Sequence, residues 1–190
     1  LAGNTLVIFA SDNGPVCYPV DRERTGHDSA GGWRGMKASN WEAGHRVPFI
    51  VRWPGNVSPG TSTNQLVSFV DVMATLADVA GAKLAGDAGV DSLSFLPVLL
   101  GRSPASAVRQ SLVVGDSLRL GSWKWIEGRE RLLFQLPNSG TDPAANEPPG
   151  LLYNLADDPG ETTNLTAARP EVVARLQSEL ERIRKSSRTR

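Results

Sequence analysis

Two short apolar segments near the start of the chain are separated by a long polar stretch. Residues 5–10 read TLVIFA and residues 47–53 read VPFIVRW, and turn residues follow each of them. Continuous apolar runs of this length, rich in β-branched and aromatic residues, predict buried strands. The stretch 13–46 has no periodicity, and loops of that length in compact domains are usually functional.

Two later segments carry apolar residues at helical spacing. The first covers residues 69–80, with Ser68 or Asp71 available as a cap and Gly81 as the terminator. The second begins at Pro170 and reaches about Lys185, with acidic residues early and basic residues late. Its expected buried stripe is Val172, Val173, Leu176, Leu180 and Ile183.

Short β-like runs lie between the two predicted helices. They cover residues 112–114, 118–120, 123–126 and 132–136, at the close spacing of antiparallel strands. Residues 137–149 are rich in Pro, Asn, Gly and Ala and predict a surface loop. We therefore expect an α/β fold with a small antiparallel sheet, on which the last helix packs.

Composition excludes several classes of protein. The 190 residues are 40% hydrophobic and 21% charged, which is typical of a folded domain. Twenty basic residues balance twenty acidic ones, so no overall field favours nucleic acid or an anionic membrane. The basic residues near the C-terminus are interpreted as complementing the dipole of the last helix. We find no apolar run of transmembrane length and no charged-then-apolar leader, and expect no membrane partner.

The polar residues after the first predicted strand are candidates for metal binding. Asp12 and Asn13 offer oxygen donors suited to a hard cation such as calcium, although Asp-Asn-Gly is also ordinary turn chemistry. Lys37 follows a glycine-bearing segment and could bring its ammonium to an oxyanion, or be an idle surface lysine. His27 and His45 are the two histidines, with no role assigned by the pattern alone. A structural ion pair is the favoured interpretation of the residues that flank His45, Glu42 and Arg46.

Cys17 is the single cysteine, which excludes an intramolecular disulfide and a cysteine-built zinc site. It begins the sequence Cys-Tyr-Pro-Val-Asp-Arg. The resemblance to the Cys-x-Pro-x-Arg pattern, in which a cysteine is converted to formylglycine, is only superficial, because Asp21 occupies the arginine position and Arg22 comes one residue late. We interpret Cys17 as an ordinary loop cysteine.

Several ordered motifs resemble the C-terminal half of the sulfatase catalytic domain, of the arylsulfatase type. They are Ser-Asp-Asn-Gly-Pro (11–15), Gly-Met-Lys (35–37), Trp-Glu-Ala-Gly-His-Arg-Val-Pro-Phe-Ile (41–50), Trp-Pro-Gly (53–55), the helix 71–81, Arg-Leu-Gly-Ser-Trp-Lys within 118–126, and Leu-Tyr-Asn-Leu (152–155) with 158–165. One departure is Ala43, where the family usually has glycine.

The resemblance implies an alkaline-phosphatase-like sulfatase fold. Residues 1–104 would form the C-terminal part of the catalytic domain with part of its main mixed sheet, and residues 105–190 the small antiparallel sheet with its terminal helix. By the same resemblance Asp12 and Asn13 would ligate one Ca²⁺, and Lys37 would be a catalytic residue that binds the substrate sulfate. The implied substrate is an aryl or carbohydrate sulfate ester.

The family also needs an Asp-Asp pair, a formylglycine sequence with its arginine and a central histidine, and none appears in these residues. We therefore expect a missing N-terminal half that carries formylglycine and no activity from the chain alone. The resemblance also implies a periplasmic or secreted enzyme. Two alternatives stay open. One is a metal-dependent phosphodiesterase or phosphatase of the same superfamily, which the small number of histidines weighs against, and the other is a non-catalytic binding module.

Overall fold

The computed structural model describes residues 1–16, 18–102, 107–128 and 149–186. These residues form two compact units. The first unit consists of the described residues within Leu1–Ala10, Phe49–Leu112 and Ile183–Arg190. The second unit consists of those within Ser11–Pro48 and Val113–Arg182. The expected domain boundary at residues 104 and 105 lies outside the described residues and stays a prediction.

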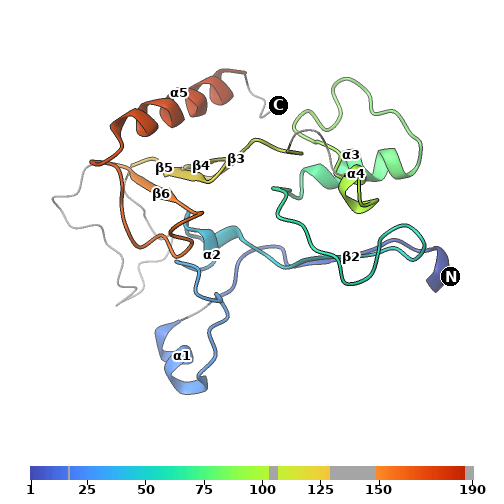
Figure 1. Ribbon diagram of the computed structural model, residues 1–190, viewed down its shortest axis with the longest axis horizontal. Helices are drawn as coiled ribbons and strands as arrows, with labels where there is room; N and C mark the ends of the chain where they lie inside the picture. Colours follow the sequence, from blue (N-terminus) through green and yellow to red (C-terminus); the bar gives the residue numbers. More distant parts are fainter. Residues whose placement is uncertain (17, 103–106, 129–148, 187–190) are drawn as a thin grey trace. The chain divides into compact units, whose positions relative to one another are not determined.

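Both predicted strands of the first unit form, but they are less buried than expected. After a short 3-10 turn, Ala2–Asn4, strand β1 (Val7–Ala10) pairs antiparallel with β2 (Phe49–Arg52), as Figure 1 shows. Val7, Phe9 and Ile50 are 46%, 60% and 59% exposed. The prediction of burial is wrong for these side chains, because alternate residues of a strand point to opposite faces and nothing among the described residues covers this one.

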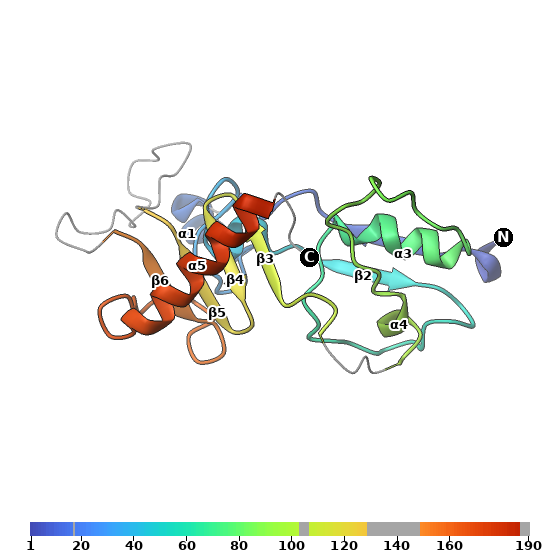
Figure 2. The same ribbon diagram turned by 90° about the horizontal axis from the view of Figure 1, so that it is seen from above.

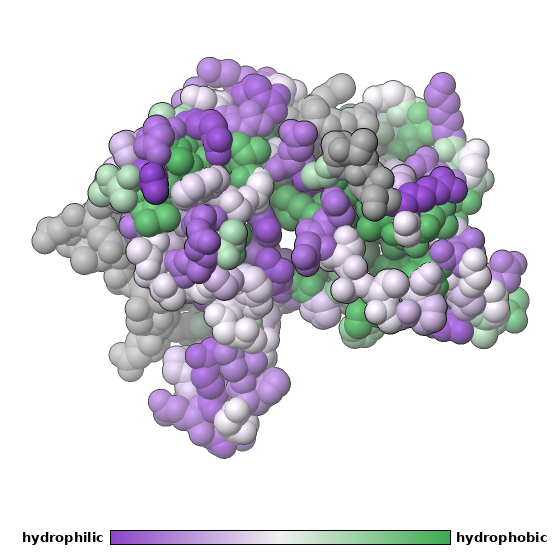
Figure 3. All heavy atoms as spheres, in the orientation of Figure 1, coloured by the Kyte–Doolittle hydropathy of each residue, from purple (hydrophilic) through white to green (hydrophobic). Residues whose placement is uncertain are grey.

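The helix predicted at 69–80 is α3, Asp71–Val79, and it is followed by the short helix α4, Leu96–Leu99. Gly81, with φ +64°, ends α3 as expected. The apolar side of α3 is also partly exposed to solvent, since Met73 and Leu76 are exposed while Asp71 and Thr75 are buried. Apolar side chains are accordingly visible at the surface in Figure 3.

The buried carboxylate of Asp71 organises the first unit. Arg109 donates to both of its oxygens, and the backbone amides of Ser68 and Leu93 donate to it at 2.9 Å. Every lone-pair direction of this carboxylate is therefore used, which a buried charge requires. Phe49 on β2 packs edge-on against Phe95, with ring centroids 5.6 Å apart.

The second unit holds the predicted small sheet. Its strands lie in the order β3-β4-β5-β6, and β5 pairs antiparallel with both β4 and β6. They are β3 (Ser111–Val114), β4 (Ser117–Leu120), β5 (Trp123–Ile126) and β6 (Leu151–Asn154). The first three confirm predicted runs. The sequence did not single out β6 as a strand, and the predicted strand 132–136 and nearly all of the loop 137–149 lie outside the described residues.

The last helix, α5 (Pro170–Ser186), lies along the sheet in both views (Figures 1 and 2). Leu176 and Leu180 of the predicted stripe are fully buried, which confirms the periodicity argument. The long stretch 13–46 contains two short helices that were not predicted, α1 (Pro19–Thr25) and α2 (Glu42–His45). Trp41 of this stretch is buried in one cluster with Ile126, Leu151, Tyr153 and Leu155, so the loop shares the core of the small sheet.

Candidate functional site

The turn after β1 presents side-chain oxygen atoms that have no partner among the described residues. Ser11 Oγ donates to the carbonyl of Asn13 at 3.0 Å, and the Asn13 Nδ2 donates to the carbonyl of Gly14 at 3.0 Å. These bonds hold the turn and leave the side-chain oxygen of Asn13 uncommitted. Asp12 is exposed, and its carboxylate makes no hydrogen bond or ion pair with any residue in the described ranges. Both side chains can therefore offer an oxygen to a cation.

Lys37 lies beside this turn. Its backbone amide donates a 2.8 Å hydrogen bond to the carbonyl oxygen of Pro15, and its exposed ammonium has no ion-pair partner in the described part of the chain. The next residue, Ala38, has φ +75°, a left-handed conformation that costs a non-glycine residue about 1–2 kcal/mol. Strain of this kind persists where the surrounding structure enforces it, and here it directs the chain immediately after the candidate lysine.

Glycines allow the loops around the turn to touch through their backbones. The Gly14 amide donates to the Gly44 carbonyl at 3.1 Å, and a Cβ on Gly14 would lie 1.8 Å from the Ala43 carbonyl oxygen. A Cβ on Gly44 would lie 2.0 Å from the Ser39 carbonyl oxygen. Ala43, the departure from the family pattern, is buried and donates its amide to the Arg34 carbonyl at 2.9 Å. The methyl group at position 43 is thus accommodated without opening the contact.

A group of charged side chains surrounds the buried carboxylates of Glu42 and Glu161. We call it the charge cluster, and its members are Glu42, His45, Arg46, Arg119, Lys124 and Glu161. The predicted pair of Glu42 with Arg46 is confirmed at 2.9 Å. Lys124 Nζ lies 3.0 Å from Glu42 Oε1 and 3.0 Å from Glu161 Oε1, and Arg119 lies 3.6 Å from Glu42. Lys124 and Glu161 stand in two of the motifs that carry the sulfatase resemblance, within 118–126 and 158–165, but they were assigned no role from the sequence. They come from β5 and from the loop before α5, and the fold brings them together.

The cluster shifts the pKa values of its members in opposite directions. Burial alone would raise the pKa of Glu42, but the hydrogen bond from His45 and the charge of Lys124 bring it far below its usual range. Burial raises the pKa of Glu161 against the opposing effect of Lys124. Burial also lowers the pKa of His45, although Glu42 opposes this. The surroundings of Glu42 therefore favour its anionic form, and burial favours the neutral form of His45.

Comparison with known proteins decides the family. The family model described as Sulfatase matches residues 1–82. An N-acetylgalactosamine-6-O-sulfatase of Bacteroides thetaiotaomicron is 36% identical over 192 residues, which cover 97% of this chain and 37% of that protein. The chain belongs to the sulfatase family.

Further comparisons agree with the sulfatase assignment. Human arylsulfatase A is 36% identical over 93% of this chain and 37% of its own length. A solved sulfatase from work on glycosaminoglycan metabolism by Bacteroides thetaiotaomicron superposes with a TM-score of 0.80, at 35% identity over 97% of this chain and 39% of that one. PsFucS1 sulfatase from Pseudoalteromonas sp., at 24% identity, 97% and 38% coverage and a TM-score of 0.68, supports the fold.

The chain therefore has the alkaline-phosphatase-like sulfatase fold. It spans a little over a third of the length of the curated relatives described above.

The metal-binding capacity of this sulfatase chain can be judged from its donors. Asp12 and Asn13 present oxygens, which suits calcium, but calcium takes six to eight of them. No group of three or more His, Cys, Asp or Glu able to hold a metal occurs in the described ranges. His27 is exposed, and its amide bonds Thr25 Oγ1; His45 belongs to the charge cluster. Cys17 lies outside the described residues. The two oxygen donors fit part of a calcium site.

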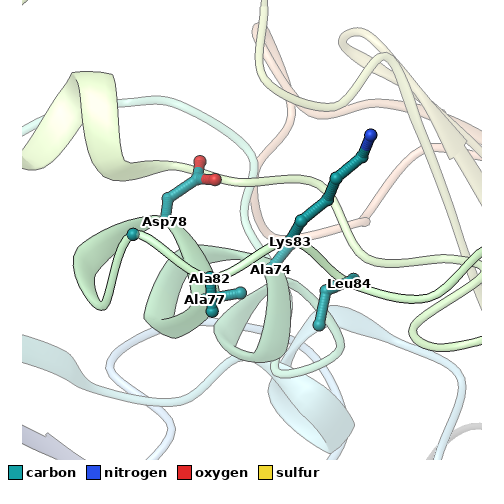
Figure 4. A pocket seen from close by; sticks show the side chains of 7 residues that line it. Ala74, Ala77, Asp78, Ala82, Lys83 and Leu84 are labelled. Carbon is teal, nitrogen blue, oxygen red and sulfur yellow. The ribbon is translucent and has the colours of Figure 1, made fainter.

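A separate surface hollow of about 390 Å³ lies in the first unit, at the end of α3 (Figure 4). It is lined by Ala74, Ala77, Asp78, Gly81, Ala82, Lys83 and Leu84. One carboxylate and one ammonium among small side chains carry no recognisable chemistry.

No described helix is long and apolar enough to cross a membrane.

Proposed function

We propose that this chain contributes calcium- and sulfate-binding residues to a sulfuric ester hydrolase of the arylsulfatase type. Family membership motivates the reaction class, and one contact carries the proposal for the residues. The hydrogen bond from the Lys37 amide to the Pro15 carbonyl holds the backbone of Lys37 next to the turn that bears Asp12. Neither the Lys37 ammonium nor the Asp12 carboxylate has a partner among the described residues. A cation and an anion that are kept unpaired on adjoining loops suit a ligand that carries charges of both signs, such as a sulfate with its metal.

In this proposal each side chain has a defined task. Asp12 and Asn13 hold a calcium ion through their oxygens, and the ion polarises the sulfate oxygens when it is bound. Lys37 places its ammonium against the sulfate and neutralises charge that develops as the ester bond breaks. The strained backbone at Ala38 and the glycine contacts fix the path of the loop. The nucleophile, proposed to be formylglycine, lies in a part of the enzyme beyond these residues.

The proposed substrates are aryl or carbohydrate sulfate esters, because the relatives include an arylsulfatase and an N-acetylgalactosamine-6-O-sulfatase. We further propose that the missing N-terminal half of the catalytic domain is the partner that completes the site. A phosphodiesterase or phosphatase of the same superfamily fits less well, since it would need histidine metal ligands. His45 lies against Glu42, 3.5 Å from it, and is occupied in the charge cluster.

The test is to express the complete reading frame that encodes this chain and to assay a generic aryl sulfate beside a diaryl phosphate. We expect turnover of the sulfate ester, its loss on calcium chelation, and a fall in kcat of about 10²–10³ in Lys37→Ala, as when other enzymes lose one group that stabilises an oxyanion. Lys83→Ala, which removes another exposed lysine, is the matched control and should keep full activity. Faster turnover of the phosphate diester, or equal kcat values for the two variants, would overturn the proposal.

A further inference from the structure

We infer that Lys124 and Glu161 are positioning residues for the candidate sulfate site, and that through them the small antiparallel sheet supports the active-site loop. The inference rests on the proposed role of Lys37. It assigns the charge cluster a task beyond local stability, because its members connect the sheet to α2, and α2 connects to the turn that carries Asp12. Each link of this connection is a contact between described residues of the second unit.

The first link joins the sheet to α2. Lys124 lies in the middle of β5, opposite Arg119 on β4 and Tyr153 on β6, and its side chain is 1% exposed. A lysine paired on both sides in a sheet has little freedom to move. Its ammonium bridges Glu42 and Glu161 at 3.0 Å each. The ion pair with Lys124 therefore fixes the position of Glu42 relative to the sheet.

The second link fixes the beginning of α2 through Glu161. The backbone amide of Glu42 donates to Glu161 Oε2 at 2.7 Å, so the carboxylate of Glu161 accepts from the first residue of the helix and also pairs with Lys124. Glu161 has φ +53°, an uncommon conformation for a non-glycine residue. Arg34 holds its carbonyl at 2.6 Å. A strained residue fixed at its carbonyl and carboxylate is suited to setting the position of another element.

The third link runs from α2 to the site. Gly44 of α2 accepts the hydrogen bond of the Gly14 amide, and the Pro15 carbonyl accepts that of Lys37. Gly14 approaches Ala43 so closely that no side chain fits between them. A shift of α2 would therefore move the turn that bears Asp12 and, with it, the backbone of Lys37.

The charge balance shows what removal of each group should do. Glu42 has Arg46, Arg119 and His45 as further partners. Among the described residues, the ion pair of Glu161 is with Lys124. Removing Lys124 leaves a buried carboxylate without its cation, which is strongly destabilising. Removing both charges restores the balance but also removes the bridge. The double variant thus separates loss of stability from loss of positioning.

The test compares Lys124→Met, Glu161→Gln and the double variant in the complete enzyme, with Glu179→Gln as matched control. Glu179 forms an exposed pair with Arg182 on α5 at 2.7 Å, apart from the charge cluster. The first measurement is amide hydrogen exchange at Gly14 and Lys37, with Trp125 and Tyr153 as reference amides in the sheet. The second is the inhibition constant of inorganic sulfate.

We expect the Gly14 and Lys37 amides of Glu161→Gln and of the double variant to exchange at least tenfold faster while the reference amides change less than twofold. The inhibition constant for sulfate should rise by a similar factor, and Glu179→Gln should leave both measurements unchanged. Unchanged exchange at Gly14 and Lys37, or equal acceleration at all four amides, would overturn the inference. If exchange responds and the enzyme never binds sulfate, the positioning contact stands and the proposed function fails.

Discussion

The amide of Lys37 is bonded to the carbonyl of Pro15 at 2.8 Å. This bond closes the base of the long loop that begins at the turn of Asp12 and Asn13. Asp12 and Lys37, which are far apart in the sequence, thereby lie on neighbouring segments of backbone. The candidate site depends on this hydrogen bond, since the side chains of Asp12 and Lys37 make no hydrogen bond or ion pair of their own to a described residue.

The closure predicts an effect of a methyl group at Gly14. A Cβ there would lie 1.8 Å from the Ala43 carbonyl oxygen, so Gly14→Ala must push the two loops apart. We expect a loss of about 1–3 kcal/mol in the free energy of unfolding, as for overpacked sites in general, measured by urea denaturation. Gly86→Ala is the matched control, because a Cβ at Gly86 meets nothing within 4 Å. Equal stability of the two variants would show that the loops are not in contact.

Burial of the last helix predicts a contrast between two leucines. Leu176 on α5 is fully buried, whereas Leu76 on α3 is 44% exposed. Leu176→Ala should cost about 2–5 kcal/mol, and Leu76→Ala clearly less, because much of its side chain already contacts solvent. Chemical denaturation of both variants gives the answer. A loss near zero for Leu176→Ala would contradict the packing of α5 on the small sheet.

The charge cluster predicts pH effects of opposite sign at its two glutamates. The pKa of Glu161 is raised in the folded state, so its stabilising contribution is present below about pH 4.5, its unfolded value, and is lost as the pH rises through the folded pKa. The pKa of Glu42 is lowered, so its contribution is present above about pH 4.5 and is lost as the pH falls towards the folded pKa.

The measurement is the free energy of unfolding of the wild type, Glu161→Gln and Glu42→Gln between pH 7.5 and 3. Relative to Glu161→Gln, the wild type should gain stability as the pH is lowered towards 4.5. Relative to Glu42→Gln, it should lose stability as the pH is lowered below 4.5. Two differences that change with the same sign would mean that one carboxylate has been assigned the wrong ionisation.

The sequence predicted the elements whose signal is local. Helical spacing predicted α3 and α5, and short β-like runs predicted β3, β4 and β5. The exposure of one face of β1 and β2 was not predictable in the same way, because an apolar run indicates a strand but does not indicate whether one or both of its faces are covered. The strand β6 was missed because four residues, Leu151–Asn154, carry no periodicity of their own and owe their conformation to pairing with β5.

The residues of the candidate site also fall into two groups, those that the sequence identified and those that it did not. Asp12, Asn13 and Lys37 were singled out because they stand in ordered motifs at positions to which the family resemblance assigns a role. Lys124 and Glu161 also stand in such motifs, but no role was assigned to them, since a lysine and a glutamate distant in sequence look like surface residues until the fold buries them. The pairing of Glu42 with Arg46 was predictable because residues four apart on a helical turn face each other.

The most direct test of the central claim is a titration of the purified 190-residue chain with sodium sulfate and calcium, followed by the NMR shifts of the Gly14 and Lys37 amides. The chain should bind calcium weakly, with a Kd above about 1 mM, because it offers two oxygen ligands, and it should not hydrolyse an aryl sulfate. Sulfate should shift both amides in the wild type and in Lys83→Ala, and the shifts should disappear in Lys37→Ala. Shifts that persist in Lys37→Ala, or turnover of the ester by the chain alone, would contradict the account.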